Sequence, residues 1–346
     1  MIHAQHDPAL RLHLVHQVPL RYAAGADHAL DRPAHVRAGS GLAWVGGRLA
    51  VVQDDANFIA LVDPATGLAL SVVLPAGAEG KRQFDVGRGN KKQKSDLEAL
   101  VGIEEPHGSM LLAIGSGSSK RREHVVMLER AGQTDETLAL IEAPALYKAL
   151  RDATDFSGSD MNIEGALIIG DVLRLFGRGN GKASKHRVPL DATCDLHWPS
   201  VVAYLAAPHQ QLPPKPTRFR QYELGEADGV RLTFTDATLA WGDRSARPLV
   251  LYTAAAECSP DSRRDGAVAG SAIGVLDSSA DGAVVRYALL LDAQERPLPL
   301  KVEGIACGSA DSRQVFVVLD VDDPDEPSVL CELRLDGPWP LPNGHP

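Results

Sequence analysis

A unit of two apolar strands joined by a tight turn recurs five times along the 346-residue chain. In each copy a polar loop follows the second strand and leads to a third, and equivalent positions are 58 to 73 residues apart. Repeats of this length with three or four strands are typical of propeller blades. The sequence therefore predicts an all-β fold, a five-bladed β-propeller, as a single domain over residues 1–346. The five copies are residues 40–63, 97–128, 163–190, 236–277 and 302–336.

Three segments outside this pattern qualify the prediction. The apolar strand at 10–20 is expected to complete the last blade and close the ring. Residues 195–235 leave room for a sixth, degenerate blade. Residues 136–154 have apolar side chains at helical spacing without glycine, which fits either a helix or an extended connection.

The first strand of four units carries a polar residue at the same place, and three of these residues are glutamates. The four are Ser40, Glu98, Glu164 and Glu303, as in "KVEGIACG" (301–308). The first strand of a propeller blade lines the central channel, so we expect these side chains to converge on the axis. Like charges so close in a partly dry channel repel one another, and a bound cation removes the repulsion. Ligands that offer only oxygen favour a hard cation such as Ca²⁺. The alternative is a channel of hydrogen-bonded glutamates with water and no metal.

Basic residues gather in loops that are expected at the same end of the channel. The loops 115–124 and 177–186 combine glycine and serine with basic residues, and 81–94 holds six basic residues and one acidic residue. Glycine-rich backbone offers N–H groups to an anion, and arginine matches phosphate oxygens in a bidentate manner. Such runs also occur as solvated loops. The substrate-binding candidates are Lys120, Arg121, Arg122, Arg178, Asn180, Lys182 and Lys185.

Aspartates follow the second strand of the first unit. Asp54 and Asp55 in "VVQDDAN" are expected beside the cation, and Asp96 precedes the first strand of the second unit. A carboxylate at this place can orient or deprotonate water. These three are the catalytic candidates, with Asp54 first, although such residues are also common in turns.

Composition restricts the partners. The 35 basic and 45 acidic residues give a net charge of −10, which disfavours nucleic acid and anionic membranes as partners. No run of about 18 apolar residues occurs, and the N-terminus has no uncharged apolar segment. The four cysteines are far apart and are expected to be free thiols in a reducing compartment. We expect a cytoplasmic monomer that acts on a small phosphorylated substrate.

The order of these residues resembles a known family. Ser, Glu, Glu, a small residue and Glu on successive first strands resemble the calcium-activated nucleotidases (apyrases), which are five-bladed propellers with Ca²⁺ on the axis. Asp54, fourteen residues after Ser40, matches an aspartate of their first blade. The strands "DLEAL" and "IEGA" are equally similar to the "esterase-like activity of phytase" proteins and related bacterial propellers. The resemblance covers roughly residues 40–336.

Two departures from the nucleotidases limit what the resemblance implies. The fourth unit places Ala237 where those proteins supply a hydroxyl ligand, so Thr235, Asp236 or Thr238 would have to replace it. The leader of a secreted nucleotidase is not seen at the N-terminus.

These observations lead to one interpretation with two alternatives. The chain is expected to be a Ca²⁺-dependent hydrolase of a phosphate ester or anhydride, acting at the mouth of the channel. A lactonase or carboxylic esterase on the same metal is the first alternative. The second is a non-catalytic propeller with a structural metal and an anionic partner.

Overall fold

Strands predominate in the computed structural model, which describes residues 1–105, 108–240, 249–258, 266–277, 285–308, 311 and 313–340. Parts of the fourth predicted unit, 241–248 and 259–265, therefore lie outside the described residues. None of the helices within these ranges has the length and apolar character needed to cross a bilayer.

The strands form groups of four antiparallel neighbours, each of which is called a blade below. Blade one also holds the short β3 (Arg21–Tyr22), which is parallel to β7. Its four main strands are β4 (Gly39–Val45), β5 (Arg48–Gln53), β6 (Phe58–Val62) and β7 (Leu68–Val73). Blade two consists of β8 (Leu97–Glu105), β9 (Gly108–Gly115), β10 (His124–Glu129) and β11 (Thr137–Glu142).

The next two blades belong to one ten-stranded sheet, because β1 (Ile2–His6) lies between their outer strands and is parallel to both. The short β16 (Glu226–Ala227) is added at the edge of blade four. Blade three consists of β12 (Ile163–Ile169), β13 (Val172–Gly177), β14 (Asp191–His197) and β15 (Thr217–Glu223). Blade four consists of β17 (Val230–Leu239), β18 (Leu249–Glu257), β19 (Val268–Asp277) and β20 (Val285–Leu289).

Blade five joins the two ends of the chain. Residues of β2 (Arg11–Pro19) pair antiparallel with β23 (Val329–Asp336), which follows β21 (Lys301–Cys307) and β22 (Gln314–Asp320) in the same sheet. The N-terminal segment thus supplies the outer strand of the blade that contains the C-terminal strand.

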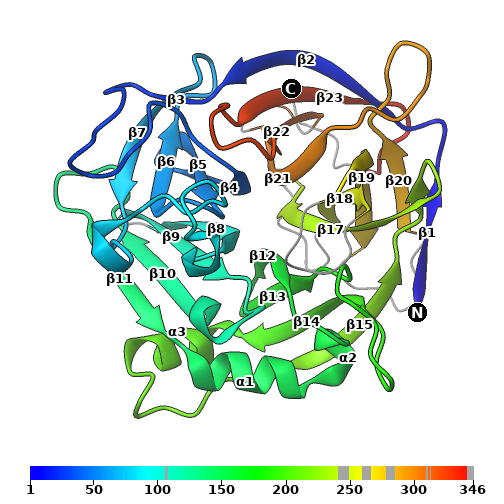
Figure 1. Ribbon diagram of the computed structural model, residues 1–346. Coiled ribbons are helices and arrows are strands. Elements are labelled where there is room, and N and C mark those ends of the chain that lie inside the picture. The colour runs from blue at the N-terminus through cyan, green and yellow to red at the C-terminus, as the bar shows by residue number, and fades with distance from the viewer. Residues whose placement is uncertain are drawn as a thin grey trace.

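The blades are arranged around a central axis (Figure 1). Each innermost strand contacts the innermost strands of the blades before and after it, in the circular order β4, β8, β12, β17 and β21. Hydrophobic clusters fill the spaces between the faces of neighbouring blades, so the core is divided around the ring. This is the β-propeller that the sequence predicts.

Each inner strand changes its pairing register once, close to its start in β4, β8, β12 and β21 and in the middle of β17. The register shifts at Glu98, at Glu164, at Glu303, and across Ser40 and its neighbour Gly41. A bulge of this kind re-aims a side chain and increases the local twist of the strand. In β17 the shift falls on Thr235, so the alignment that put Ala237 at the equivalent position is wrong by two residues.

Glycine follows three of these bulged residues because the inner strands approach one another closely there. A Cβ on Gly41 would lie 2.6 Å from the carbonyl oxygen of Glu98, and one on Gly304 would lie 2.8 Å from that of Ser40. Gly165 is packed in the same way against the backbone of Asp236. The recurrent Ser-Gly and Glu-Gly pairs thus combine an axial side chain with a close contact between blades.

The α-helices lie at the periphery of the propeller (Figure 1). Residues 136–154, for which the sequence allowed a helix or an extended segment, contain both β11 and α1 (Pro144–Asp152). Residues 195–235 add α3 (Trp198–Ala206) and the outer strand β15 to blade three, and among the described residues no inner strand of a sixth blade. The remaining helices are α2 (Thr154–Ser157), η1 (Ala78–Gly80), η2 (Lys91–Gln93) and η3 (Lys120–Arg122).

The Gly41→Ala substitution is expected to lower the free energy of unfolding by about 1–3 kcal/mol, the usual effect of overpacking. The added methyl group meets backbone atoms of the next blade, which cannot rotate away. Gly87→Ala is the control, since its methyl group meets only the side chain of Asp85, at 3.3 Å. Urea unfolding of both variants measures the difference, and equal midpoints would contradict the proposed contact.

Candidate functional site

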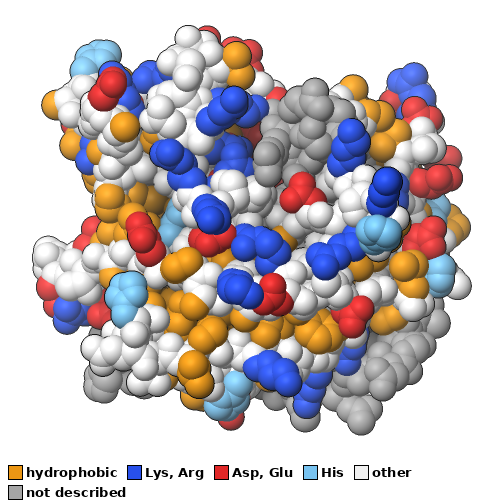
Figure 2. Space-filling view, turned by 60° about the horizontal axis from the view of Figure 1, so that its bottom comes forward, with side chains coloured by type: hydrophobic (Ala, Val, Ile, Leu, Met, Phe, Trp, Pro, Cys, Tyr) orange, Lys and Arg blue, Asp and Glu red, His pale blue; other side chains and the backbone are white. Residues whose placement is uncertain are grey.

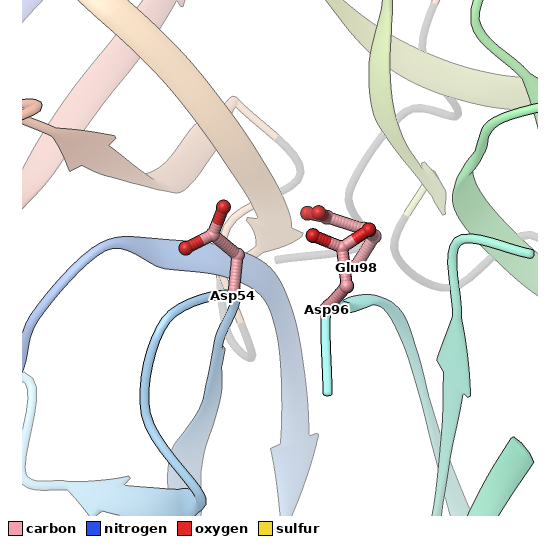
Figure 3. Close-up of side chains that lie close together, drawn as sticks. All are labelled: Asp54, Asp96 and Glu98. Atoms are coloured by element: carbon pink, nitrogen blue, oxygen red, sulfur yellow. The ribbon is translucent and has the colours of Figure 1, made fainter. Parts of the chain in front are cut away.

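The axial carboxylates fall into two groups with different partners. Asp54, Asp96 and Glu98 form the first group, here called the cation cluster, in which one oxygen of each lies within 4.8 Å of the others (Figure 3). Asp54 follows β5 of blade one, whereas Asp96 precedes and Glu98 belongs to β8 of blade two. Asp96 adopts a left-handed conformation with φ of 57°, which aspartate tolerates better than most residues.

Asp96 is the best satisfied member of the cation cluster. Its Oδ1 lies 2.7 Å from the Lys94 ammonium, and its Oδ2 accepts a hydrogen bond of 2.7 Å from Arg122. Ser116 donates to the same carboxylate. Burial alone would raise the pKa of Asp96, but the two cations hold it below its usual value. Lys94 is also paired with Asp54, whose pKa burial raises in spite of that contact.

Glu98 differs from its neighbours because its carboxylate has no hydrogen-bond donor among the described residues. The residue is 8% exposed. Burial, followed by the charges of Asp96, Glu164 and Asp54, raises its pKa well above the usual value, which Lys94 offsets only in part. A buried carboxylate is normally either paired or coordinated to a metal. Glu98 is therefore the axial carboxylate with the greatest need of a positive charge.

The second group of axial carboxylates consists of Glu164 and Glu303, and Arg178 pairs with both. Its guanidinium lies 3.4 Å from Glu164, 3.6 Å from Glu303 and 2.9 Å from Glu257. Burial, together with the charge of Glu303, still raises the pKa of Glu164 to about 8, although Arg178 opposes the shift. Arg178, expected at a substrate-binding rim, is only 5% exposed, so its charge is used inside the propeller.

Lys301 completes the pairing of Glu303. Its ammonium lies 3.3 Å from Glu303, 3.2 Å from Asp320 and 3.0 Å from Asp322. The other oxygen of Glu303, Oε2, is buried and has no partner among the described residues. Ser40, the remaining residue of the expected metal set, donates a long hydrogen bond of 3.5 Å to the carbonyl of Ala38, just before the start of β4.

The basic loops begin at the same end of the axis as the cation cluster. Arg122 contacts Asp96 directly, and Asn180, two residues beyond Arg178, accepts a hydrogen bond from Asn162 beside Glu164. The exposed basic side chains of these loops are Lys120, Arg121, Lys182 and Lys185. Figure 2 shows lysine and arginine side chains interspersed with acidic ones across the middle of one face.

A cavity of about 600 Å³ adjoins the cation cluster, because Asp54 belongs to both. Its walls are residues 33–38 and 54–55 beside the strands of blade one, the loop of residues 83–91, and residues 320–325 at the end of β22 and beyond it. The loop contributes Arg88 and Lys91, whereas the opposite segment is acidic. The acidic side chains of that segment are Asp320, Asp322, Asp323 and Asp325.

Asp55 is the catalytic candidate that the cavity favours most. Arg37 binds its Oδ2 through Nε at 3.1 Å and Nη2 at 2.5 Å, and Oδ1 has no partner among the described residues. Burial, and then the charge of Asp54, raises the pKa of Asp55 to about 7, while Arg37 lowers it. A carboxylate with this pKa can accept a proton near neutral pH.

The sequence predicted Arg122 and Arg178 as substrate-binding residues and not as partners of these carboxylates. Lys94 was predicted only as part of the basic run 81–94, and Lys301 and Arg37 carried no prediction. A signal existed for Lys301, because alternate residues of a strand share one face and Lys301 precedes Glu303 by two. Arg37 precedes the repeat, and no spacing rule connects it with Asp55.

The donor set of the cation cluster fits a hard divalent cation. It offers carboxylate oxygens from three residues, and one of these, Glu98, has no hydrogen-bond donor within the described ranges. Such oxygens are the ligands that Ca²⁺ prefers. Of the four residues expected to bind metal, Glu98 alone belongs to the cluster, whereas Glu164 and Glu303 already have cationic partners.

Comparison with known proteins gives a family and several similar folds. A family model described as a family of unknown function (DUF6929) matches residues 35–335. No curated protein matches the chain. Glutaminyl cyclase of Myxococcus xanthus is 11% identical over 95% of this chain and 97% of its own, with a TM-score of 0.47.

Two further solved structures are similar over most of their length. A putative exported protein of Bacteroides fragilis is 10% identical, covering 97% of this chain and 99% of its own, with a TM-score of 0.37. The extracellular domains of Drosophila semaphorin 1a are 8% identical, covering 90% and 81%, with a TM-score of 0.36. At such low identity these are similarities of fold and not of function.

In the absence of divalent cations, the stability of the protein is expected to fall as the pH rises above about 4.5. The folded state keeps a proton on Glu98 that the unfolded chain releases near the usual pKa of 4.5, so unfolding is favoured up to the raised pKa. Glu98→Gln should flatten this dependence, and the exposed Glu326→Gln should not. Urea unfolding in EDTA at pH 5 and pH 8 measures it, and identical pH dependence in all three proteins would contradict the assignment.

Proposed function

This chain belongs to the family of unknown function DUF6929, and we propose that it is a Ca²⁺-dependent hydrolase of a phosphate ester or anhydride. One observation carries the proposal. Asp54 belongs both to the cation cluster and to the wall of the 600 Å³ cavity, so a bound cation would face a space large enough for a small substrate.

The proposed cation ligands are Asp54, Asp96 and Glu98. When bound, Ca²⁺ would supply a Lewis acid that polarises a phosphoryl or carbonyl oxygen. Glu164 and Glu303, which the sequence also suggested, would act from the next layer and hold Arg178 and Lys301 in place. Ser40 is 6% exposed and would complete the wall of the site.

Asp55 is proposed as the group that takes a proton from the attacking water. Arg37 fixes the carboxylate through Oδ2 and leaves Oδ1 without a described partner. Asp54 is less suited to this role because Lys94 is bound to it, and Asp96 because Lys94 and Arg122 both hold it. An ionised Asp55 is required, so the proposed activity depends on pH near the pKa of this residue.

Phosphate is the preferred substrate class because of the basic side chains at this end of the propeller. Arg88 and Lys91 line the cavity. Lys120 and Arg121 are exposed on the loop whose next residue, Arg122, contacts Asp96. Lys182 and Lys185 would contribute from the adjacent loop. These groups would hold the phosphate oxygens that the cation leaves free.

A carboxylic ester or lactone is the second candidate substrate, and the acidic wall of the cavity favours it. Asp323 and Asp325 are exposed there, and they would repel a substrate with several negative charges. The charges of Arg122 and Arg178 are also engaged by Asp96 and by the axial glutamates. An uncharged ester would avoid both difficulties.

Calcium is expected to raise both stability and turnover. At a concentration one hundred times its Kd it should stabilise the fold by about 2.7 kcal/mol, through linkage to binding. Phosphate release from a panel of nucleotides and phosphomonoesters should require Ca²⁺ and stop in EDTA. Turnover of p-nitrophenyl carboxylic esters alone would select the second candidate, and a raised Tm without any turnover would select a non-catalytic propeller.

Asp55→Asn is expected to lower kcat by about a hundredfold or more, as loss of a general base does. In the unchanged protein kcat/KM should rise with pH through about 7, because the base must be ionised, and this limb should vanish in the variant. Asp152→Asn, at the exposed end of α1, is the control. A kcat that Asp55→Asn leaves unchanged would remove Asp55 from the mechanism.

A further inference from the structure

Lys94 lies where the proposed cation would bind. We propose that its ammonium group is a built-in competitor for that site, which a divalent cation must displace in order to reach Asp54, Asp96 and Glu98. This inference rests on the cation site proposed above, and it concerns how the chain itself sets the affinity of that site.

The contacts of Lys94 carry the inference. Its Nζ lies 2.7 Å from Asp96 and is also paired with Asp54, while its side chain is only 10% exposed. The cluster oxygens lie within 4.8 Å of one another, and Ca²⁺ would need to approach each to about 2.3–2.6 Å. An ammonium that touches two of the three carboxylates therefore shares the space of the cation. Two positive charges so close, away from bulk water, repel strongly.

The balance of charge favours exchange over simultaneous binding. With Lys94 in place, Lys94 and Arg122 offset the charges of Asp54 and Asp96, and Glu98 has no hydrogen-bond donor in the part of the chain that the structure describes. If a divalent cation replaced the ammonium, it would neutralise the cluster together with Arg122. Lys94 alone cannot do so, since its single charge is paired with Asp54 and Asp96.

The position of Lys94 connects this exchange with the cavity. Lys94 directly follows η2, and residues 83–88 and Lys91 of the same loop line the cavity wall. The lysine side chain has four carbons and rotates freely once released. Release of the ammonium from the cluster would place a free positive charge beside the cavity. Cation binding would thus displace the Lys94 ammonium from the metal site and, in the same step, add a basic group near the substrate.

Calcium titration of three variants by calorimetry tests the competition directly. Lys94→Met removes the charge and keeps much of the side-chain volume, and it should bind Ca²⁺ at least tenfold more tightly than the unchanged protein. Lys94→Arg keeps a cation in the cluster and should not gain affinity. Lys92→Met removes an exposed lysine of η2 and is the matched control, with an affinity expected within twofold of the original.

Lysine acetylation of the unchanged protein provides a second readout that needs no variant. With EDTA, Lys94 should be protected relative to the exposed Lys92, and saturating Ca²⁺ should raise its labelling rate at least tenfold, as read by peptide mass spectrometry. Calcium binding that leaves Lys94 protected would overturn the inference. So would a folded Lys94→Met protein whose Ca²⁺ affinity is unchanged or weaker, or the absence of Ca²⁺ binding by every protein tested.

The remaining outcomes separate this inference from the proposed function. Tighter Ca²⁺ binding by Lys94→Met without hydrolysis of any substrate would support the competitor and reject the hydrolase. If Lys94→Met were the one protein of the set to bind Ca²⁺, the result would support Lys94 as the competitor. It would also show that Lys94 excludes the metal from the unchanged protein.

Discussion

The neutralisation of carboxylates buried on the propeller axis is the interaction on which the rest of the site depends. Asp96, Glu98, Glu164 and Glu303 lie within the ring of inner strands, where charge is poorly screened. The chain compensates most of them with its own cations, namely Lys94, Arg122, Arg178 and Lys301. What these cations leave uncompensated, chiefly Glu98, defines where an external cation can bind. The candidate site thus lies where the protein's own cations do not fully balance the buried negative charge.

Backbone geometry determines where these charges are placed. A register shift in each inner strand re-aims the bulged side chain, and glycine after three of these residues lets neighbouring strands approach closely. Asp236, beside the bulge of β17, uses its carboxylate differently. It accepts backbone hydrogen bonds from Ile305 at 2.9 Å and Leu42 at 3.4 Å, and so ties three inner strands together. The bulged segments of the inner strands therefore hold neighbouring blades together and also place the side chains of the site.

The sequence predicted more of the fold than of the site, and the reason is physical. Strand periodicity and the repeat are local, so they identified the propeller class and placed Glu98, Glu164 and Glu303 on the inner strands. The register in β17 was missed because alternate residues of a strand share one face, so a displacement of two residues keeps the apolar pattern and made Ala237 look equivalent to Thr235. Partners such as Arg178 for Glu303 join different blades, and no spacing along the chain encodes that contact. Burial of Arg178 likewise depends on the closed ring.

The position of β1 has a consequence for the order of events during synthesis. Its residues lie between β15 and β20, 220 and 281 residues later in the chain, while β2 pairs with β23 later still. Strands made early must therefore remain unpaired until most of the protein has left the ribosome. Contacts of such high sequence separation slow folding and prolong the exposure of strand edges. A protein fused to the N-terminus would lie beside β1, between the outer strands of blades three and four. It would therefore slow the assembly of the ring more than it would destabilise the folded propeller.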